Sequence, residues 1–478
     1  MSKRASIAKN TTSLFVSRVM GSLTTVVLVA IIARTLGTEG FGRYTFALSV
    51  GAILAVTVDF GLSFLIPREV ARRDSRFEEY IATGCVIKTV FSIVVFVLLI
   101  VFLRYFYPPA VRYAVYAAFA MAALRGMVEF CASFFNAYER MHYSALLFLI
   151  CSFGAFGVGV AAILAGVRDA WGILLAQAAV MLLFVGVAFW LIFKVLRPKK
   201  LRVNRRLCMA TLRRTAPFGL FAIGGVVYFQ IDNVLLSIFR DVEEVGFYQG
   251  AIRLIIATEM LPLVLSNAIY PTISRVLKES EKDAVAIMQK MMYVVLIIGL
   301  PIGATIMMLA KPIVLLIFGS NYTAIVSALA IVAWLVPIRF CGHILGTALS
   351  ASGNQKFRTW ASWLAVGVNI TMNLIMLPRY GYIGAAITSV FTSFFLVSFY
   401  YVALHLRFYR FEVFRVIVRL ALPMAALLIF LRLAGQLNVF LAAGAGLVVY
   451  CVMLIPAGVL TRRYIVTFGK LVLDKGKD

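Results

Sequence analysis

TSLFVSRVMGSLTTVVLVAIIAR, residues 12–34, is an apolar run long enough to cross a bilayer as one helix, and an arginine, Arg18, lies in its interior. About 20 mostly apolar residues span the hydrocarbon core of a membrane as an α-helix. Similar runs recur along the chain and predict an all-α polytopic membrane protein with about 14 transmembrane helices. The predicted spans are 12–34, 44–66, 81–103, 111–136, 143–167, 171–193, 215–238, 246–270, 289–310, 324–351, 358–378, 382–405, 416–433 and 437–460.

Composition and charge agree with this class. The chain has 478 residues, of which 63% are hydrophobic, and a formal net charge of +26. The loops, both termini and the ends of the spans carry 32 of the 46 Lys and Arg residues on one side of the membrane and nine on the other. Cytoplasmic loops collect Lys and Arg, so we expect both termini in the cytoplasm and the chain in the plasma (inner) membrane. Nucleic-acid binding is disfavoured, because the charges lie in short loops rather than on one folded face.

The chain also repeats itself. Residues 33–42 match 239–248 at a constant offset of 206, through an arginine and a Gly-Phe pair, and residues 136–140 are matched with 352–356. The two copies are six-span units. Because each has an even number of spans, both insert with the same orientation, and an axis along the membrane normal relates them. The predicted domains are an N-terminal six-helix lobe (1–196), a basic cytoplasmic linker (197–214), a C-terminal six-helix lobe (215–409), and two additional transmembrane helices with a cytoplasmic tail (410–478).

Five cations lie in the interior of the predicted spans, more than three residues from either end. A charge within a bilayer span costs about 2.5–3.5 kcal/mol or more, so such residues usually face protein or water and mark a pathway. A membrane protein that keeps five of them is expected to handle an anionic substrate. They are Arg18, Lys88, Arg125, Arg253 and Arg339.

Two of these cations occupy the same place in the fourth span of each half. Arg125 has Glu129 one turn later, and Arg339 has His343 one turn later. Residues four apart share a helix face, and two arginines on a shared cavity would suit phosphate oxygens. The alternative is a self-neutralised Arg125–Glu129 pair that ties helices together. Arg339 has no acid on its own helix, which favours the pathway interpretation there.

The other three cations are less decisive. Lys88 can snorkel to the interface, and Arg18 can too, although its helix has a polar, small-residue face that suits a cavity or close packing. Arg253 lies about two turns into its span, with Glu259 almost two turns further on. Asp59 is a further intramembrane acid.

Asp232 has no cation within one turn of its own helix, which makes it a candidate proton or cation site. Asn369, Asn373 and Thr388, from later spans, are predicted to contribute oxygen ligands. Such ligands suit a hard cation such as sodium better than a transition metal. The alternative is a hydrogen-bond network that packs helices.

Catalytic chemistry is not predicted. The sequence has no P-loop, its three histidines are not spaced for a metal, and no Ser or Cys nucleophile has a recognisable base. Six cysteines lack metal-ligand spacing, so neither disulfides nor zinc are expected. We therefore expect no enzyme, no catalytic residue, no cofactor, and no metal beyond a coupling ion.

The first seventy residues carry a resemblance. Arg18, the run Ala33-Arg34-Thr35-Leu36-Gly37-Thr38-Glu39-Gly40-Phe41-Gly42-Arg43-Tyr44, then Asp59-Phe60-Gly61-Leu62 and Arg68-Glu69-Val70-Ala71-Arg72, resemble the polysaccharide transporter (Wzx-type oligosaccharide flippase) family. This family belongs to the multidrug/oligosaccharidyl-lipid/polysaccharide exporter (MOP) superfamily, which also contains MurJ and the MATE transporters.

The resemblance implies a flippase that moves a polyprenyl-pyrophosphate-linked oligosaccharide to the outer leaflet by alternating access. It implies a cationic central cavity between two lobes, for which Arg18, Arg125, Arg253 and Arg339 are the available positions. Relatives of the MurJ type also imply a sodium site, which Asp232, Asn369, Asn373 and Thr388 fit by location. A second acid expected near Asn373 is replaced by the amide, which weakens that implication. The expected partners are the lipid-linked glycan, membrane lipid, and glycosyltransferases or a polymerase of the same pathway, with the chain a monomer.

Three alternatives stay open. For a MATE-like ion-coupled exporter of small molecules, an acid-dominated cavity is expected. The spans contain five interior cations and four acids, and this balance disfavours that alternative. A lipid II flippase of the MurJ type would share the fourteen spans. A non-transporting scaffold of a glycan-assembly complex is the third possibility.

Overall fold

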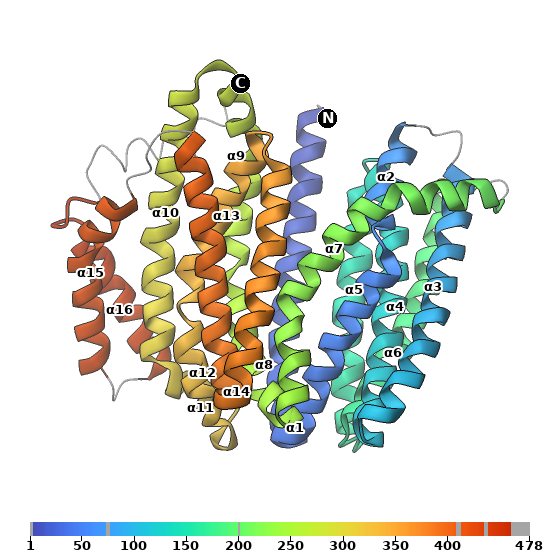
Figure 1. Cartoon of the computed structure of the whole chain (residues 1–478), viewed down its shortest axis with the longest axis horizontal. Coiled ribbons are helices and arrows are strands. Elements are labelled where there is room, and N and C mark those ends of the chain that lie inside the picture. The colour runs from blue at the N-terminus through green and yellow to red at the C-terminus, as the bar shows by residue number, and fades with distance from the viewer. Residues whose placement is uncertain (1–2, 73–76, 199–200, 408–412, 435–437, 460–478) are drawn as a thin grey trace. The chain divides into compact units, whose positions relative to one another are not determined.

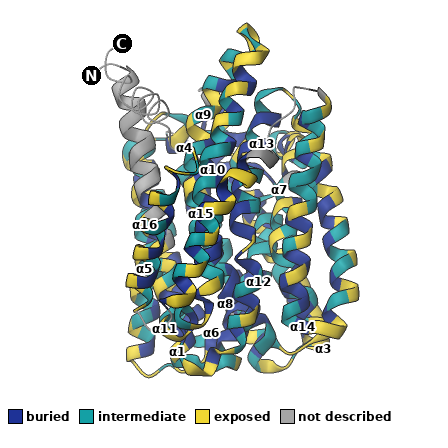
Figure 2. Ribbon diagram, turned by 90° about the vertical axis from the view of Figure 1, so that its left-hand side faces the viewer, coloured by how far each residue is buried: buried dark blue, intermediate teal, exposed yellow. Residues whose placement is uncertain are grey.

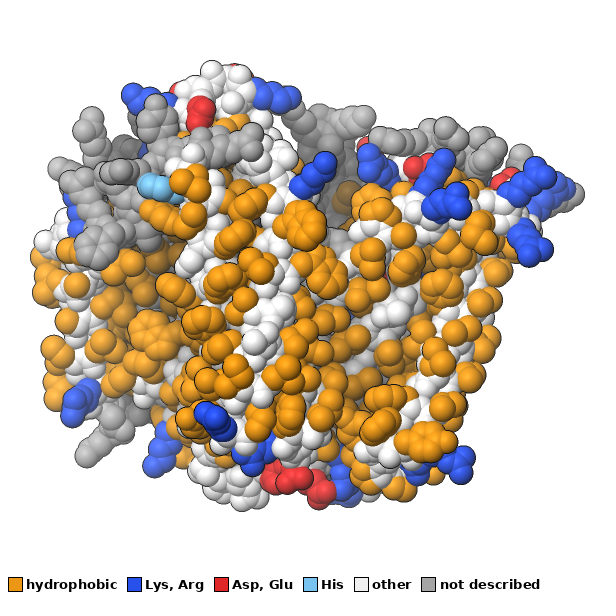
Figure 3. Space-filling view, viewed as in Figure 1, with side chains coloured by type: hydrophobic (Ala, Val, Ile, Leu, Met, Phe, Trp, Pro, Cys, Tyr) orange, Lys and Arg blue, Asp and Glu red, His pale blue; other side chains and the backbone are white. Residues whose placement is uncertain are grey.

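The computed structural model describes residues 3–72, 77–198, 201–407, 413–434 and 438–459, and these form helices and connecting turns without a strand (Figure 1). Hydrophobic side chains cover a broad band along the helices, while Lys and Arg gather at the helix ends above and below it on the face shown in Figure 3. Exposed residues occur along the whole length of the helices in Figure 2, as expected where lipid is the solvent.

Two helices are each too long for one crossing. α1 (Lys3–Asp59) has 57 residues and α14 (Gln355–Arg407) has 53. At about 1.5 Å per residue each would be more than twice as long as a bilayer core is thick. Each contains one non-helical residue, Gly37 or Gly381, and reverses direction there (Figure 1). Each therefore supplies two spans.

Eleven helical stretches in the described part of the chain are long and apolar enough to cross a membrane. Two of them contain the paired spans of α1 and α14, and α16 (Val439–Met453) is a shorter apolar helix beside them. The predicted all-α class and the count of fourteen spans are thereby confirmed.

The chain divides into two compact units. The first comprises Met1–Arg253 and Val366–Ala385, and the second Leu254–Ala365 and Ala386–Asp478. The lobe boundaries expected from the repeat stay a prediction. Helices that begin in the first unit, besides α1, are α2 (Leu62–Arg72), α3 (Phe77–Phe106), α4 (Pro109–Ala137), α5 (Met141–Leu164), α6 (Ala170–Leu191), the π-helix η2 (Ile192–Leu196), α7 (Arg205–Phe239) and α8 (Val242–Thr258).

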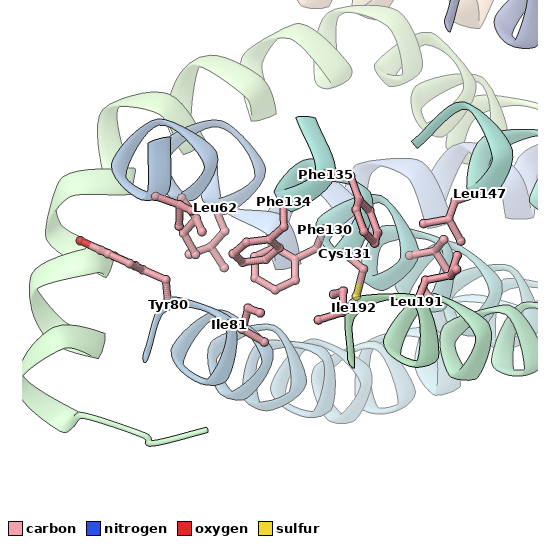
Figure 4. Packing of buried hydrophobic residues seen from close by; sticks show 14 of the residues in the cluster. Leu62, Tyr80, Ile81, Phe130, Cys131, Phe134, Phe135, Leu147, Leu191 and Ile192 are labelled. Carbon is pink, nitrogen blue, oxygen red and sulfur yellow. The ribbon is translucent and has the colours of Figure 1, made fainter. Parts of the chain in front are cut away.

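In the first unit, α4 packs against α1, α5 and α6, and buried aromatic and aliphatic residues of α2, α3, α4, α5, α6 and η2 form one cluster. Phe130, Phe134 and Phe135 are fully buried there (Figure 4). Lipid tails are as apolar as these rings, so close van der Waals packing holds such helices together.

A helix crossing in this unit brings Gly246, from the second copy of the Gly-Phe repeat, against Gly42, the residue that follows the first copy. A Cβ atom added to Gly42 in α1 would lie 2.2 Å from the carbonyl oxygen of Val242 in α8. A Cβ atom on Gly246 would lie 3.0 Å from the Cα of Gly42. Only glycine allows the two backbones to approach this closely.

The second unit is built around α10 (Glu281–Met308), which packs against α9, α13 and α15. The last two spans belong to it, because α15 packs on α10 and the Tyr450 hydroxyl of α16 donates to the carbonyl of Ile297 at 2.9 Å. Its remaining elements are α9 (Met260–Glu279), α11 (Ala310–Ile317), the 3₁₀-helix η3 (Ser320–Tyr322), α12 (Ala324–Val332), α13 (Leu335–Ala351) and α15 (Val413–Leu433).

Local structure supports the repeat and corrects its register. After α4, the Arg140 N–H donates to the Phe135 carbonyl at 2.8 Å, and after α13 the Asn354 N–H donates to the Leu349 carbonyl at 2.9 Å. Both are helix ends closed by a residue with positive φ. The offset is 214 residues, which is also the offset between Arg125 and Arg339. The match of 136–140 with 352–356 was therefore wrong by two residues.

Candidate functional site

Lys88 is held by Asp59 in the interior of the first unit. Its Nζ lies 2.6 Å from Asp59 Oδ1, and the two side chains are 2% and 17% exposed. Asp59 is the last residue of α1, where the helix is interrupted before α2, and it also accepts from the hydroxyl and the N–H of Ser63. Snorkelling of Lys88 to the interface, one of the two possibilities left open, is not what the structure shows, because the ammonium is buried and this carboxylate compensates its charge.

Arg339 is paired in the same manner in the second unit. Its guanidinium donates to Glu259, with side chains 13% and 19% exposed. Glu259 lies between α8 and α9, again where a helix is interrupted. Arg339 has no acid on its own helix, as expected, but Glu259 supplies one from another helix, so the absence of a local acid does not favour the pathway interpretation. His343 lies within electrostatic range of this pair and of Arg358.

The two pairs follow one plan. In each half of the chain, an acid at a break in the second span binds a cation from a later span of the same half. A helix break leaves backbone groups and side chains free to turn inward, and an ion pair compensates the charge of both partners. Sequence spacing missed both pairs, because their members are 29 and 80 residues apart.

Arg125 differs from these two. Its Nε donates to Glu129 on the same helix at 3.1 Å, as the i, i+4 spacing predicted, but the side chains are 41% and 58% exposed. The guanidinium also lies 5.6 Å from the ring of Phe148. An exposed pair contributes little to stability, so Arg125 keeps donors available to a ligand.

Arg253, in α8, has no carboxylate partner among the described residues, and its buried Nε has no hydrogen-bond acceptor there. Tyr44 is its electrostatic neighbour in the first unit, and the Tyr44 hydroxyl donates to Gln177 at 3.3 Å. A buried guanidinium donor without an acceptor is costly unless a ligand or water supplies one. The side chain of Arg18 lies outside the described residues.

Asp232 lies in a polar network within the first unit. Its carboxylate accepts from the Tyr248 hydroxyl and from the Asn373 side-chain amide, each at 2.7 Å. The same Asn373 amide donates to Asn369 at 3.0 Å. Three of the four residues predicted for an ion site are thus brought together, and Thr388 is buried in the second unit. Tyr248 was missed, because nothing in a lone tyrosine distinguishes a ligand from a packing residue.

The donor set of this network fits a hard cation. Asp232 supplies a carboxylate, and the amide oxygens of Asn373 and Asn233 are buried without a hydrogen-bond partner among the described residues. Carboxylate and amide oxygens are the ligands that sodium-like and other hard cations prefer. The Asn373 amide nitrogen now points at Asp232, so ligation by its oxygen requires the amide to rotate.

A clamp fixes the part of α14 that carries the two asparagines. The Arg240 guanidinium donates to the carbonyls of Leu377 and Pro378, at 3.3 and 2.8 Å. The Glu244 carboxylate accepts from the N–H of Tyr382 at 2.8 Å. Both clamp residues come from the junction of α7 and α8, so the turn at Gly381 is tied to the helices that carry Asp232 and Tyr248.

Comparisons with known proteins agree with this fold. Residues 7–277 match the family model described as polysaccharide biosynthesis protein, and residues 217–375 match the MatE family model. The probable low-salt glycan biosynthesis flippase Agl15 of Haloferax volcanii is 21% identical over 385 residues, which are 80% of each chain. The probable flippase AglR of the same organism is 26% identical over 34% of this chain and 35% of its own.

Solved structures show the same architecture. The lipid II flippase MurJ in an inward closed conformation has a TM-score of 0.77 at 14% identity, covering 96% of this chain and all of its own. An inward-facing multidrug resistance MATE family transporter of the MOP superfamily has a TM-score of 0.58 at 15% identity, covering 81% of this chain and 94% of its own. At such identities the likeness establishes the fold.

Proposed function

Because the chain belongs to the polysaccharide biosynthesis protein family, we propose that it is a flippase that moves a polyprenyl-pyrophosphate-linked oligosaccharide from the cytoplasmic to the outer leaflet. The chain is a MOP-superfamily membrane transporter rather than an enzyme, which confirms the resemblance found in its sequence. Relatives named as glycan biosynthesis flippases support the substrate class.

The proposal depends on which intramembrane cations lack a buried acid partner. Arg253 has a buried guanidinium nitrogen without an acceptor among the described residues, and Arg125 is paired but exposed. Guanidinium groups bind phosphate oxygens through parallel hydrogen bonds. We assign these two arginines to the diphosphate of the headgroup, with Arg18 in support, while the prenyl tail stays in lipid.

Lys88 and Arg339 take a different role in this proposal. Each is mostly buried and bonded to an acid at a helix break. Separating such a pair leaves an uncompensated charge in an apolar medium, which costs several kcal/mol. They hold the interrupted helices in place and contribute to the electrostatic field rather than to direct binding, together with Asp59 and His343.

Movement of the headgroup requires alternating access, with the coupling ion bound at Asp232. The sodium or proton would neutralise the carboxylate that Tyr248 and Asn373 now satisfy. Such neutralisation shifts a conformational equilibrium only if the ion binds one state better than the other. Cytoplasmic termini, a plasma-membrane location, a monomeric chain, and association with glycosyltransferases or a polymerase belong to the same proposal.

Reconstituted vesicles test the headgroup site. Wild type, Arg253→Ala and Arg125→Ala are compared for the appearance of a fluorescent polyprenyl-pyrophosphate-linked oligosaccharide in the opposite leaflet. Loss of a charge-assisted contact of about 1.5–3 kcal/mol predicts a fall in initial rate of roughly tenfold or more. Arg168→Ala, an exposed arginine outside the spans, is the matched control. Wild-type rates in both cavity variants would rule out this site.

A second function has one observation in its favour. The match of residues 217–375 to the MatE family model admits a MATE-like exporter of small molecules. Export of organic cations by the reconstituted chain, without movement of the lipid-linked oligosaccharide, would establish it. Including lipid II as a second substrate in the same vesicles separates a MurJ-type flippase from the proposed one.

A further inference from the structure

The basic stretch before the seventh span has no part in the proposed transport site. Residues 194–214 contain nine Lys and Arg and no Asp or Glu. α7 begins at Arg205, where the side chain of Asn204 accepts from two backbone N–H groups, at 3.0 and 3.2 Å. The apolar run of this helix begins only after Arg214. The first turns of α7 therefore form a capped helix outside the apolar span.

This part of α7 is two-sided. Leu207, Cys208 and Leu212 pack against the hydrophobic cluster of the first unit, and Thr211 and Thr215 are buried. Successive residues of a helix are about 100° apart, which places all five within one arc. Figure 1 shows the beginning of α7 running across the ends of neighbouring helices before it bends into the bundle.

The opposite arc, with the extended residues before it, forms an exposed basic face. Its apolar members are about half exposed, and its arginines are exposed as well. In Figure 3, Lys and Arg gather at this edge, directly above the band of hydrophobic side chains. Arg214 is excluded, since it lies 3.7 Å from Glu69. The basic face consists of Leu201, Arg202, Val203, Arg205, Arg206, Met209 and Arg213.

Arginines interleaved with exposed apolar side chains fit the boundary between lipid headgroups and acyl chains. The apolar groups enter the acyl region while the guanidinium groups reach the phosphates. A surface whose own charged residues are all basic attracts anionic lipid, and each Lys or Arg near the surface adds to the attraction. A soluble partner would not require apolar residues beside the edge of the membrane band.

We propose that the basic face binds anionic phospholipid headgroups in the leaflet at the α7 N-terminal end of the bundle. The inference does not rest on the proposed substrate, because it needs only a chain inserted in a bilayer. It assigns the linker a lipid-binding role in addition to setting membrane orientation.

Fluorescence quenching in nanodiscs tests the lipid preference. Met209→Trp places an indole on the basic face of the full chain, and the same chain without this substitution gives the background of the native tryptophans. The bilayer is phosphatidylcholine with about 20 mol% of either dibrominated phosphatidylglycerol or dibrominated phosphatidylcholine. At this proportion the brominated lipid can still become enriched around the basic face. We expect the glycerol lipid to quench the added indole about two- to threefold more strongly.

Two comparisons identify the cause. Replacing Arg202, Arg205, Arg206 and Arg213 with Gln should make the two lipids equal, whereas Arg104→Gln, Arg112→Gln and Arg168→Gln together should leave the preference unchanged. Without any arginine substitution, 1 M NaCl shortens the screening length to about 3 Å and should weaken the preference. Equal quenching in the parent, quenching by neither lipid, or a preference that survives both treatments would overturn the proposal.

Discussion

Asp59 ends α1 at the point where the second span is interrupted, and the buried ammonium of Lys88 lies 2.6 Å from its carboxylate. The carboxylate at the helix interruption thus compensates the buried charge of Lys88, and the lysine compensates the carboxylate. The carboxylate also accepts from Ser63 at the beginning of α2, so one acid satisfies both a cation and a helix start.

The stability of this pair can be measured by a double-mutant cycle. Lys88→Met or Asp59→Asn alone leaves a buried charge without its partner, which predicts a loss of about 3–5 kcal/mol. The double variant should lose less than the sum, and thermal unfolding in detergent measures all four proteins. Arg125→Met and Glu129→Gln form the control cycle, because that pair is exposed and should contribute about 0–1 kcal/mol. Additive losses at Lys88 and Asp59 would contradict the coupling.

The ion site makes its own prediction. Asn373→Asp adds a second carboxylate beside Asp232 and should lower the sodium concentration for half-maximal translocation by roughly tenfold, since one charge pair contributes at least 1.4 kcal/mol at partial burial. Asp232→Asn should remove the dependence on an imposed sodium or proton gradient. Thr371→Val, at an exposed position of the same helix, should change neither. A gradient dependence that persists in Asp232→Asn would place coupling elsewhere.

Gly381 is predicted to be indispensable for the clamp. Its φ is +54°, and an added Cβ atom would lie 2.0 Å from a Glu244 carboxylate oxygen. Gly381→Ala should therefore reduce stability by about 1–3 kcal/mol, and by less in a Glu244→Ala background, where the clash is gone. Gly367→Ala on the same helix meets open space and should be neutral or stabilising by up to about 1 kcal/mol. Similar unfolding midpoints for both alanine variants would refute this explanation.

At the two matched helix ends, opposite substitutions should change the stability of the chain in opposite directions. Glu139 has φ of +57° after α4, whereas the equivalent residue after α13 is Gly353 with φ of +77°. Glu139→Gly should stabilise the chain by about 0.5–1 kcal/mol and Gly353→Ala should destabilise it by about 1 kcal/mol, because side chains are strained in this region. Unfolding in detergent compares both with wild type. The same sign of change for both would show that the ends are not equivalent.

Much of the fold could be predicted from the sequence. An apolar run of span length identifies a transmembrane helix without knowledge of the other helices, because each helix satisfies its backbone hydrogen bonds internally. The Gly-Phe repeat was visible in the same way, and its second copy lies at the crossing of α1 and α8, where Gly246 meets Gly42. The Arg125–Glu129 pair was also predictable, since four residues along a helix fix the contact.

Partners from different helices were not predictable. Sequence spacing assigned Arg339 to His343 and left Lys88 without an acid, whereas Glu259 and Asp59 compensate these charges from other helices. The sequence did suggest that Asp232, Asn369 and Asn373 lie together, because they are polar residues inside apolar spans, and the family resemblance supported this grouping. Tyr248 had no such resemblance to identify it.

The sequence by itself determined the membrane class, the number of spans, the bias of basic residues and the internal repeat. Each of these depends only on the order of residues along the chain and not on which helices pack together. Only the tertiary structure decided which buried cations are compensated by acids. The physical reason is that an apolar interior strongly favours pairing of charges but leaves the partner to helix packing, which brings together residues far apart in the chain.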